Sequence, residues 1–282
     1  MRAGTRGSAA MAVLSMLVAM AMAAAWTERF QQDAGEAGAN SPLKGAAQGG
    51  ERSPSGPPAR PTQDTDRKGR GNEPGPARSP KPVSDELSHA SDSGRKAVNI
   101  TIDDGPHPEF TPRMLDVLKE YGARATFCVV GAQARRHPQL VKRIVAEGNR
   151  LCNHGDSHDS TMDRKPAAHQ AKEILDSAEA IRDASGGVPA MYYRAPGGAF
   201  TAYSRKLAAR HGMRPPGWNV DPRDWALPGV DAIVRSVRSQ LANGPTVLLH
   251  DGGGDRAQSV EALRRLLPWM KKQGYTFGFP VR

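Results

Sequence analysis

Residues 97–106 read AVNITIDDGP, a short apolar run that leads directly into two aspartates, a glycine and a proline. The first six residues, Ala97–Ile102, predict a β-strand, because apolar and β-branched side chains crowd into a short segment that turn-forming residues close. The two carboxylates follow the strand rather than interrupt it. The stretch therefore predicts a strand that delivers Asp103 and Asp104 to one edge of a sheet.

Short apolar segments of this kind alternate with amphipathic segments from here to the C-terminus. The expected strands are Ala97–Ile102, Ala125–Val130, Leu151–Cys152, Tyr192–Tyr193, Trp218–Val220, Thr246–Leu249 and Tyr275–Phe279. The first expected helix has Thr111 as its N-cap and Pro112 as its first residue, and the next ones span 138–147, 166–183, 203–211, 230–241 and 259–272. This alternation predicts an α/β fold with a parallel sheet, either a barrel or an open doubly wound sheet. A length of about 185 residues favours a small or incomplete barrel over a full eight-unit one.

The first third of the chain has a different composition. A positively charged start precedes the apolar run Met11–Ala25, which ends in small residues. This pattern predicts a signal peptide over residues 1–25, with an uncleaved membrane anchor as the alternative. Residues 26–95 are rich in Pro, Gly, Ser and charge and lack apolar periodicity, which predicts a disordered linker. The folded domain is therefore expected at 96–282, in a protein that is secreted or associated with the cell wall.

The net charge is +10, from 39 Lys and Arg against 29 Asp and Glu. The arginines are scattered and form no basic run interleaved with aromatic residues, so the charge does not indicate a nucleic-acid-binding protein. A basic surface suits an anionic cell wall, because long-range attraction brings the two together. No stable protein partner is expected.

Polar residues collect after five of the expected strands. These groups are Asp103–Pro106, Asn153–His158, Arg194–Gly198, Asp221–Trp225 and His250–Gly252. In parallel α/β folds the site lies at the carboxyl ends of the strands, so the five groups are expected to meet.

His154, His158 and Asp104 together offer two imidazoles and one carboxylate, a set that leaves coordination positions open and is typical of a catalytic metal. Zn²⁺ suits these ligands best, and Co²⁺, Ni²⁺, iron or manganese would also fit. Asp103 is then placed to deprotonate a metal-activated water, and His250 to act as a general acid.

The ordered motifs resemble those of the polysaccharide deacetylase family, carbohydrate esterase family four. They are Thr101–Pro106, His154-x3-His158, Arg194-x-Pro196, Asp221-x2-Asp224-Trp225 and Leu248-Leu249-His250. The resemblance covers roughly residues 96–282. It implies a distorted, incomplete (β/α) barrel of about seven parallel strands, and metal-dependent removal of acetyl groups from a polysaccharide.

The resemblance also implies a role for each motif residue. Asp103 is implied to be the catalytic base, oriented by Arg194, and His250 the general acid, polarised by Asp224. The implied metal ligands are Asp104, His154 and His158. The N–H of Gly197 is implied to bind the oxyanion, and Trp225 and Pro196 to line the substrate groove.

Two positions depart from the family pattern. Gly155 stands where the family usually has Ser or Thr, whose hydroxyl braces the metal loop, and Ser157 is the candidate substitute. Gly197 stands where the family often has Tyr, which removes one wall of the substrate groove.

The two cysteines end two successive expected strands. If those strands are neighbours, Cys128 and Cys152 come within bonding range, and export would permit a disulfide.

Several functions remain open at this point. The leading interpretation is an N-deacetylase acting on N-acetylglucosamine units of chitin, chitooligosaccharide or peptidoglycan. The alternatives are an O-acetyl esterase acting on xylan and a glycan-binding protein without activity. A zinc peptidase is disfavoured, because the sequence has no His-Glu-x-x-His motif.

Overall fold

The computed structural model describes residues 81–282, so the expected signal peptide and most of the expected linker lie outside the described residues. The described part contains a six-stranded parallel sheet. The strands are β1 Ala97–Asp103, β2 Ala125–Val129, β3 Arg150–Asn153, β4 Tyr192–Tyr193, β5 Thr246–His250 and β6 Thr276–Phe277. Their order is β4-β3-β2-β1-β5, and β6 pairs with the start of β1.

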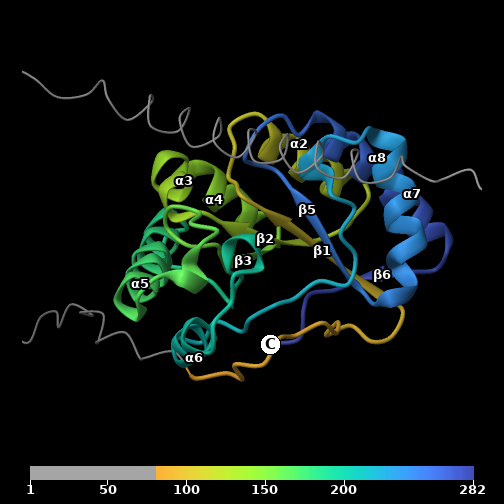
Figure 1. The fold of residues 1–282 in the computed structure, drawn as a ribbon. Coiled ribbons are helices and arrows are strands. Elements are labelled where there is room, and N and C mark those ends of the chain that lie inside the picture. Colours follow the sequence, from red (N-terminus) through yellow and green to blue (C-terminus); the bar gives the residue numbers. More distant parts are fainter. Residues whose placement is uncertain (1–80) are drawn as a thin grey trace, which may run out of the picture. The chain divides into compact units, whose positions relative to one another are not determined.

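Seven α-helices of the described part surround these strands (Figure 1). They are α2 Phe110–Glu120, α3 Gly131–Arg136, α4 Pro138–Ala146, α5 Ala167–Ala184, α6 Ala202–Arg210, α7 Val230–Gln240 and α8 Ala257–Lys272. Within residues 81–282 none of the helices is both long and apolar enough to span a membrane.

Strand β1 shows how the fold separates its core from its site. All seven of its residues are buried. Val98, Ile100 and Ile102 belong to the main hydrophobic core, which they share with the helices. Because successive side chains of a strand point to opposite faces, the residues between them, such as Thr101 and Asp103, lie on the other face, inside the curve of the sheet. The outer face thus stabilises the fold, while the inner face carries polar groups toward the site.

The sheet is an incomplete barrel, as predicted, but it has six paired strands rather than about seven. The expected strand Trp218–Val220 is wrong: this segment contributes only an isolated bridge between Val220 and Val247 of β5. Arg214, a few residues earlier, makes a second isolated bridge to Tyr192 of β4. The irregular segment between these bridges therefore spans the gap between the two edge strands without forming a strand itself.

The predicted linker is too long at its C-terminal end. Residues 81–95 were expected to be disordered, yet Ser88 pairs with Pro216 and Ser91 with Pro280. The carboxylate of Asp92 also accepts a hydrogen bond from the amide of Phe279. Composition misses this segment because the groups that it pairs with are supplied by distant parts of the chain.

The start of α2 also differs from the prediction. The helix begins at Phe110, so Thr111 is inside it and is not its N-cap. The Thr111 hydroxyl instead accepts a hydrogen bond from the amide of His107 and donates one to the carboxylate of Asp251. A residue that resembles a capping residue in the sequence therefore links the first strand-end loop to Asp251, which follows β5.

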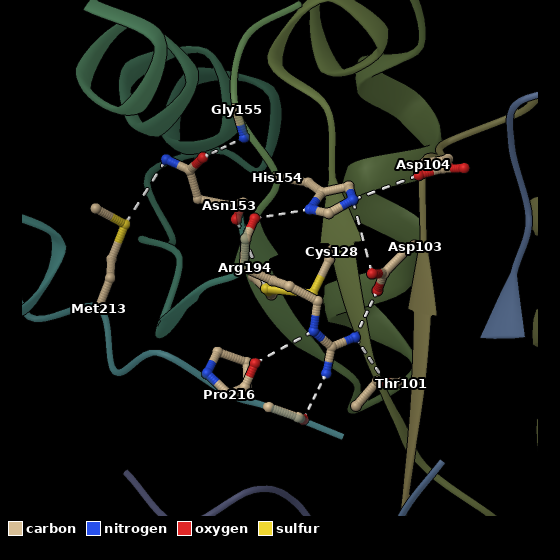
Figure 2. The surroundings of a disulfide bond; sticks show 12 residues. Thr101, Asp103, Asp104, Cys128, Asn153, His154, Gly155, Arg194, Met213 and Pro216 are labelled. Carbon is tan, nitrogen blue, oxygen red and sulfur yellow. Dashed lines mark hydrogen bonds and ion pairs between the residues drawn. A yellow bond between two sulfur atoms is a disulfide. The ribbon is translucent and has the colours of Figure 1, made fainter. Parts of the chain in front are cut away.

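The prediction of a disulfide is confirmed. Cys128 on β2 and Cys152 on β3 are partners in the strand register, and the structure joins them (Figure 2). Both are buried on the inner face of the sheet beside Tyr192.

Candidate active site

The strand register brings the predicted site residues together. Asp103 at the end of β1 is paired with His250 at the end of β5. His154 follows β3 directly and Arg194 follows β4 directly. Parallel strands end at the same edge of the sheet, so residues that are up to 147 positions apart in the sequence meet there.

Arg194 holds the carboxylate of Asp103. One guanidinium nitrogen donates to Oδ1 of Asp103 and to the hydroxyl of Thr101, both at 2.8 Å (Figure 2). The other two donate to the carbonyls of Pro216 and Gly217. Arg194 is 1% exposed, so its charge is buried and its position is determined by these partners. The bond from this buried guanidinium holds one carboxylate oxygen of Asp103 in place.

Asp104, His154 and His158 form a cluster in which the candidate ligand atoms lie within 4.8 Å of one another. Oδ1 of Asp104 lies 3.4 Å from Nε2 of His154 and 3.0 Å from Nε2 of His158. Ligand atoms bound to one tetrahedral metal at about 2.0–2.2 Å are separated by roughly 3.3–3.6 Å. The donor types and these separations therefore fit a divalent metal such as zinc.

The backbone bends sharply at this cluster. Asp104 has φ 80° and His158 has φ 60°, both in the left-handed region that non-glycine residues avoid. The backbone therefore leaves the extended conformation of β1 at Asp104. Strained backbone of this kind is concentrated at functional sites, where the surrounding structure holds it.

Hydrogen bonds orient His154 and keep the Asp104 carboxyl ionised. Nδ1 of His154 lies 2.7 Å from the carbonyl oxygen of Arg194, which leaves Nε2 facing the cluster. Burial by itself raises the pKa of the Asp104 carboxyl, but hydrogen bonds from His154 and His158 hold that pKa well below its usual range. Asp104 is consequently an anionic ligand at neutral pH.

His250 and Asp224 form a buried pair on the other side of Asp103. Nδ1 of His250 lies 2.7 Å from Oδ1 of Asp224, whose second oxygen accepts bonds from the His250 amide and the Ser259 hydroxyl. Burial lowers the pKa of His250, but the Asp224 carboxylate outweighs it and, together with Asp104 and Asp103, raises the pKa to about 9. The imidazole is therefore protonated at neutral pH and can serve as an acid.

The rim differs in part from the predicted groove. Trp225 is 46% exposed, so part of its ring is available to a ligand, while the guanidinium of Arg223 lies over the ring, 5.0 Å from its centre. Pro196, by contrast, is buried, and the position of a Cβ on Gly155 lies 3.4 Å from its ring. Pro196 thus supports the metal loop rather than lining an open groove. Gly197 is exposed and leaves that side open.

Sequence reasoning missed two buried carboxylates beside the site. Asp251 is completely buried against Gly105, and burial raises the pKa of its carboxyl to about 7. Glu173 on α5 bonds to the loop between the two histidines. A glutamate on the buried face of a predicted helix was the only signal for Glu173, and its partners cannot be identified from spacing.

Comparison with known proteins identifies relatives with deacetylase names. The family described as Polysaccharide deacetylase matches residues 90–216. A peptidoglycan-N-acetylglucosamine deacetylase of Bacillus cereus is 40% identical over 190 residues, which cover 66% of this chain and 86% of the relative. A chitooligosaccharide deacetylase of Sinorhizobium fredii is 39% identical over 197 residues, which cover 66% of this chain and 90% of the relative.

A solved structure extends the likeness to the fold. It is a crystal structure of a peptidoglycan N-acetylglucosamine deacetylase, with a TM-score of 0.64 and 30% identity. The match covers 68% of this chain and 89% of the solved one. Together with the ordered motifs and the cluster at the strand ends, these matches show that the chain belongs to the polysaccharide deacetylase family.

Proposed function

We propose that this protein hydrolyses the acetamido group of N-acetylglucosamine units in a glycan and releases acetate. The observation that carries the proposal is the arrangement around Asp103: a three-residue ligand set on one side and a protonated histidine on the other. A base, an electrophile site and an acid in one place are what amide hydrolysis requires. The names of the two relatives support a substrate that contains N-acetylglucosamine.

The metal proposed for Asp104, His154 and His158 is zinc, with cobalt or nickel as substitutes. Zinc is supported by the mixed nitrogen and oxygen donors and by their separations. When bound, a divalent ion would supply a Lewis acid for the acetyl carbonyl and would lower the pKa of the attacking water.

The residues of the chain divide the proton transfers between them. Oδ1 of Asp103 is engaged by Arg194, so its Oδ2 is left to accept a proton from the attacking water. His250, held through Nδ1 by Asp224, donates a proton from Nε2 to the amide nitrogen as the bond between carbon and nitrogen breaks. Asp103 thus takes one proton from water and His250 gives one to the leaving nitrogen, which yields acetic acid and the free amino sugar. Asp103 then loses its proton to solvent and His250 regains one from solvent, and the acetic acid ionises to acetate.

Two groups are proposed to hold the substrate. The N–H of Gly197 is proposed to bind the developing oxyanion, a role that backbone amides commonly fill. The exposed ring of Trp225 provides an apolar surface for a sugar ring. The missing aromatic side chain at Gly197 leaves room for a bulky glycan on that side.

The domain organisation and the location are also proposals. Residues 1–25 are proposed to direct export, residues 26–80 to link, and residues 81–282 to form the catalytic domain of a secreted or wall-associated enzyme. The disulfide between Cys128 and Cys152 supports export, since such bonds persist in oxidising compartments. The net charge of +10 supports contact with an anionic cell wall.

The test is acetate release by the full-length protein after metal removal and after zinc is restored. The substrates are chitotetraose, peptidoglycan and acetylxylan, and the control is Asp103→Asn. Zinc-dependent release from either of the first two, absent in the variant, is the expected result. Release from acetylxylan alone would replace the proposal with an O-acetyl esterase, and no release despite zinc binding would leave only a glycan-binding role.

A further inference from the structure

The loop between the two histidine ligands raises a question that the motif residues do not answer. Gly155 has no hydroxyl to brace the loop, and its φ of 75° places it in the left-handed region. The loop must nevertheless hold His154 and His158 in a strained arrangement around Asp104. Something else has to hold the backbone in place.

Part of the support is backbone. The carbonyl of Gly155 accepts a hydrogen bond from the amide of Gly131, and the carbonyl of Asp156 accepts one from the amide of Ala132, both at the start of α3. The amide of Gly155 donates to the side chain of Asn153 (Figure 2). These bonds leave the amides of the next two residues without a backbone acceptor.

Glu173 accepts hydrogen bonds from both of those amides. Its Oε2 lies 2.9 Å from the amide nitrogen of Asp156 and 2.8 Å from that of Ser157. Its Oε1 accepts a third bond, at 2.9 Å, from the hydroxyl of Ser157. The carboxylate thus spans the loop between the two ligands from the adjacent helix α5.

The chemistry of Glu173 favours a dedicated role over incidental packing. Glu173 is only 8% exposed. Within residues 81–282 its carboxylate forms no ion pair with a Lys, Arg or His side chain. Burying a carboxylate without a cation is costly unless hydrogen bonds satisfy it. The three loop donors are the bonds that satisfy this one, and charge-assisted bonds of this length are strong and directional.

We infer that Glu173 is the positioning residue of the metal site: its carboxylate holds Asp156 and Ser157 so that His154 and His158 converge on Asp104. The brace comes from the neighbouring helix and replaces the hydroxyl that the family pattern led us to expect at position 155. A Cβ on Gly155 would lie 3.4 Å from Oε2 of Glu173, so the carboxylate packs directly against the position where the family carries its hydroxyl residue. This inference rests on the proposed metal site.

The experiment measures zinc affinity of the full-length protein by competition with a chromophoric chelator. Glu173→Ala is expected to lower the affinity about 10- to 100-fold, the usual effect of losing a residue that orients metal ligands. Glu173→Gln is expected to stay within a few-fold of wild type, because its amide oxygen still accepts both backbone bonds. Glu179→Ala, an exposed glutamate on the same helix, is the matched control and should bind zinc like wild type.

A second readout separates positioning from general stability. Thermal unfolding of the metal-free proteins reports any loss of stability, and the absorption spectrum of the cobalt-loaded proteins reports the geometry of the ligands. The inference requires an altered cobalt spectrum in Glu173→Ala, together with the lower zinc affinity. Should Glu173→Ala fail to fold, Ser157→Ala, which removes one of the three bonds, is expected to lower zinc affinity by several-fold.

The outcomes are distinguishable. Wild-type zinc affinity and an unchanged cobalt spectrum in Glu173→Ala would overturn the inference and leave the proposed function standing. Equal losses in Glu173→Ala and Glu173→Gln would also overturn it, because they would point to charge rather than to the hydrogen-bond geometry. A wild-type protein that binds no zinc would refute the proposed function, and the inference with it.

Discussion

The pKa of His250 offers the most direct test of the proposed acid. Asp224→Asn removes the charge that holds this pKa at about 9 and leaves a side chain of the same shape. Since the ordinary value is 6.5, the shift of about 2.5 pH units corresponds to roughly 3 kcal/mol. Without the Asp224 charge, the main interaction that raises the pKa of His250 is lost, while burial still lowers that pKa. The pKa is therefore expected to fall to about 6.5 or below.

The change in pKa predicts a loss of activity that depends on pH. At pH 8, a group with a pKa of about 9 is roughly 90% protonated, whereas one with a pKa of about 6.5 is roughly 3% protonated. The variant should therefore lose about 30-fold in kcat/KM at pH 8 and less than about twofold at pH 6 from this cause. A bound divalent cation would lower both pKa values, but the alkaline limb of the variant would still lie at lower pH than that of wild type.

The assay is the pH profile of kcat/KM for chitotetraose between pH 5 and pH 10, supported by an NMR titration of His250 in the metal-free protein. Ser259→Ala is the matched control, because it removes a hydrogen bond to Asp224 without removing charge. An alkaline limb that coincides in wild type and Asp224→Asn would refute the assignment of His250 as the acid. A loss that is uniform across pH would indicate damaged packing instead.

The same shift links the stability of the fold to pH. The folded-state pKa of His250 is raised, so the folded protein binds its proton more tightly than the unfolded chain does. This contribution is complete below pH 6.5, is lost as the pH rises through about 9, and amounts to roughly 3 kcal/mol. Asp224→Asn should therefore flatten the dependence of the unfolding free energy on pH in that range.

Three further changes test other parts of the site. Asp103→Asn should lower kcat by about 10²- to 10⁴-fold with zinc affinity retained, measured by acetate release and chelator competition. Gly155→Ser should destabilise the protein by about 1–2 kcal/mol in urea unfolding, because its φ of 75° lies in the left-handed region that residues with a Cβ avoid; a more stable variant would contradict this. Replacing Cys128 and Cys152 together by Ser should cost about 3 kcal/mol under non-reducing conditions, and thiol titration of the wild-type protein should find neither residue free.

Much of the site could be predicted because its chemistry restricts the residue types. A metal needs imidazole or carboxylate ligands, and proton transfer needs groups such as Asp103 and His250. These residues come directly after apolar runs, which places them at the ends of strands. Because parallel strands end at the same edge of a sheet, the predicted α/β fold also predicted that the motifs meet. The disulfide was predicted for the same reason, since two adjacent parallel strands carry the cysteines.

The failures lie where a segment depends on partners far along the chain. Trp218–Val220 has the composition of a strand, but only Val220 makes a β-bridge to β5, while Asn219 bonds to Thr246 at the start of that strand. The Trp218 ring lies 5.5 Å from the Arg194 guanidinium. Residues 81–95 have the composition of a linker, yet Ser88 and Ser91 form β-bridges with Pro216 and Pro280, far along the chain. In both cases tertiary contacts outweigh the local preference.

The sequence by itself determined which side chains carry the chemistry and at which edge of the sheet they gather. The family resemblance had already implied that Arg194 orients Asp103 and that Asp224 polarises His250. Only the tertiary structure decided the contacts themselves, with Arg194 reaching Asp103 across 91 residues, and only it showed Glu173 on the metal loop. Periodicity and spacing report neighbours along the chain, because they arise from the local geometry of helices and strands. A buried charge is satisfied by whichever donors the packed fold brings to it, and those donors have no fixed spacing in the sequence.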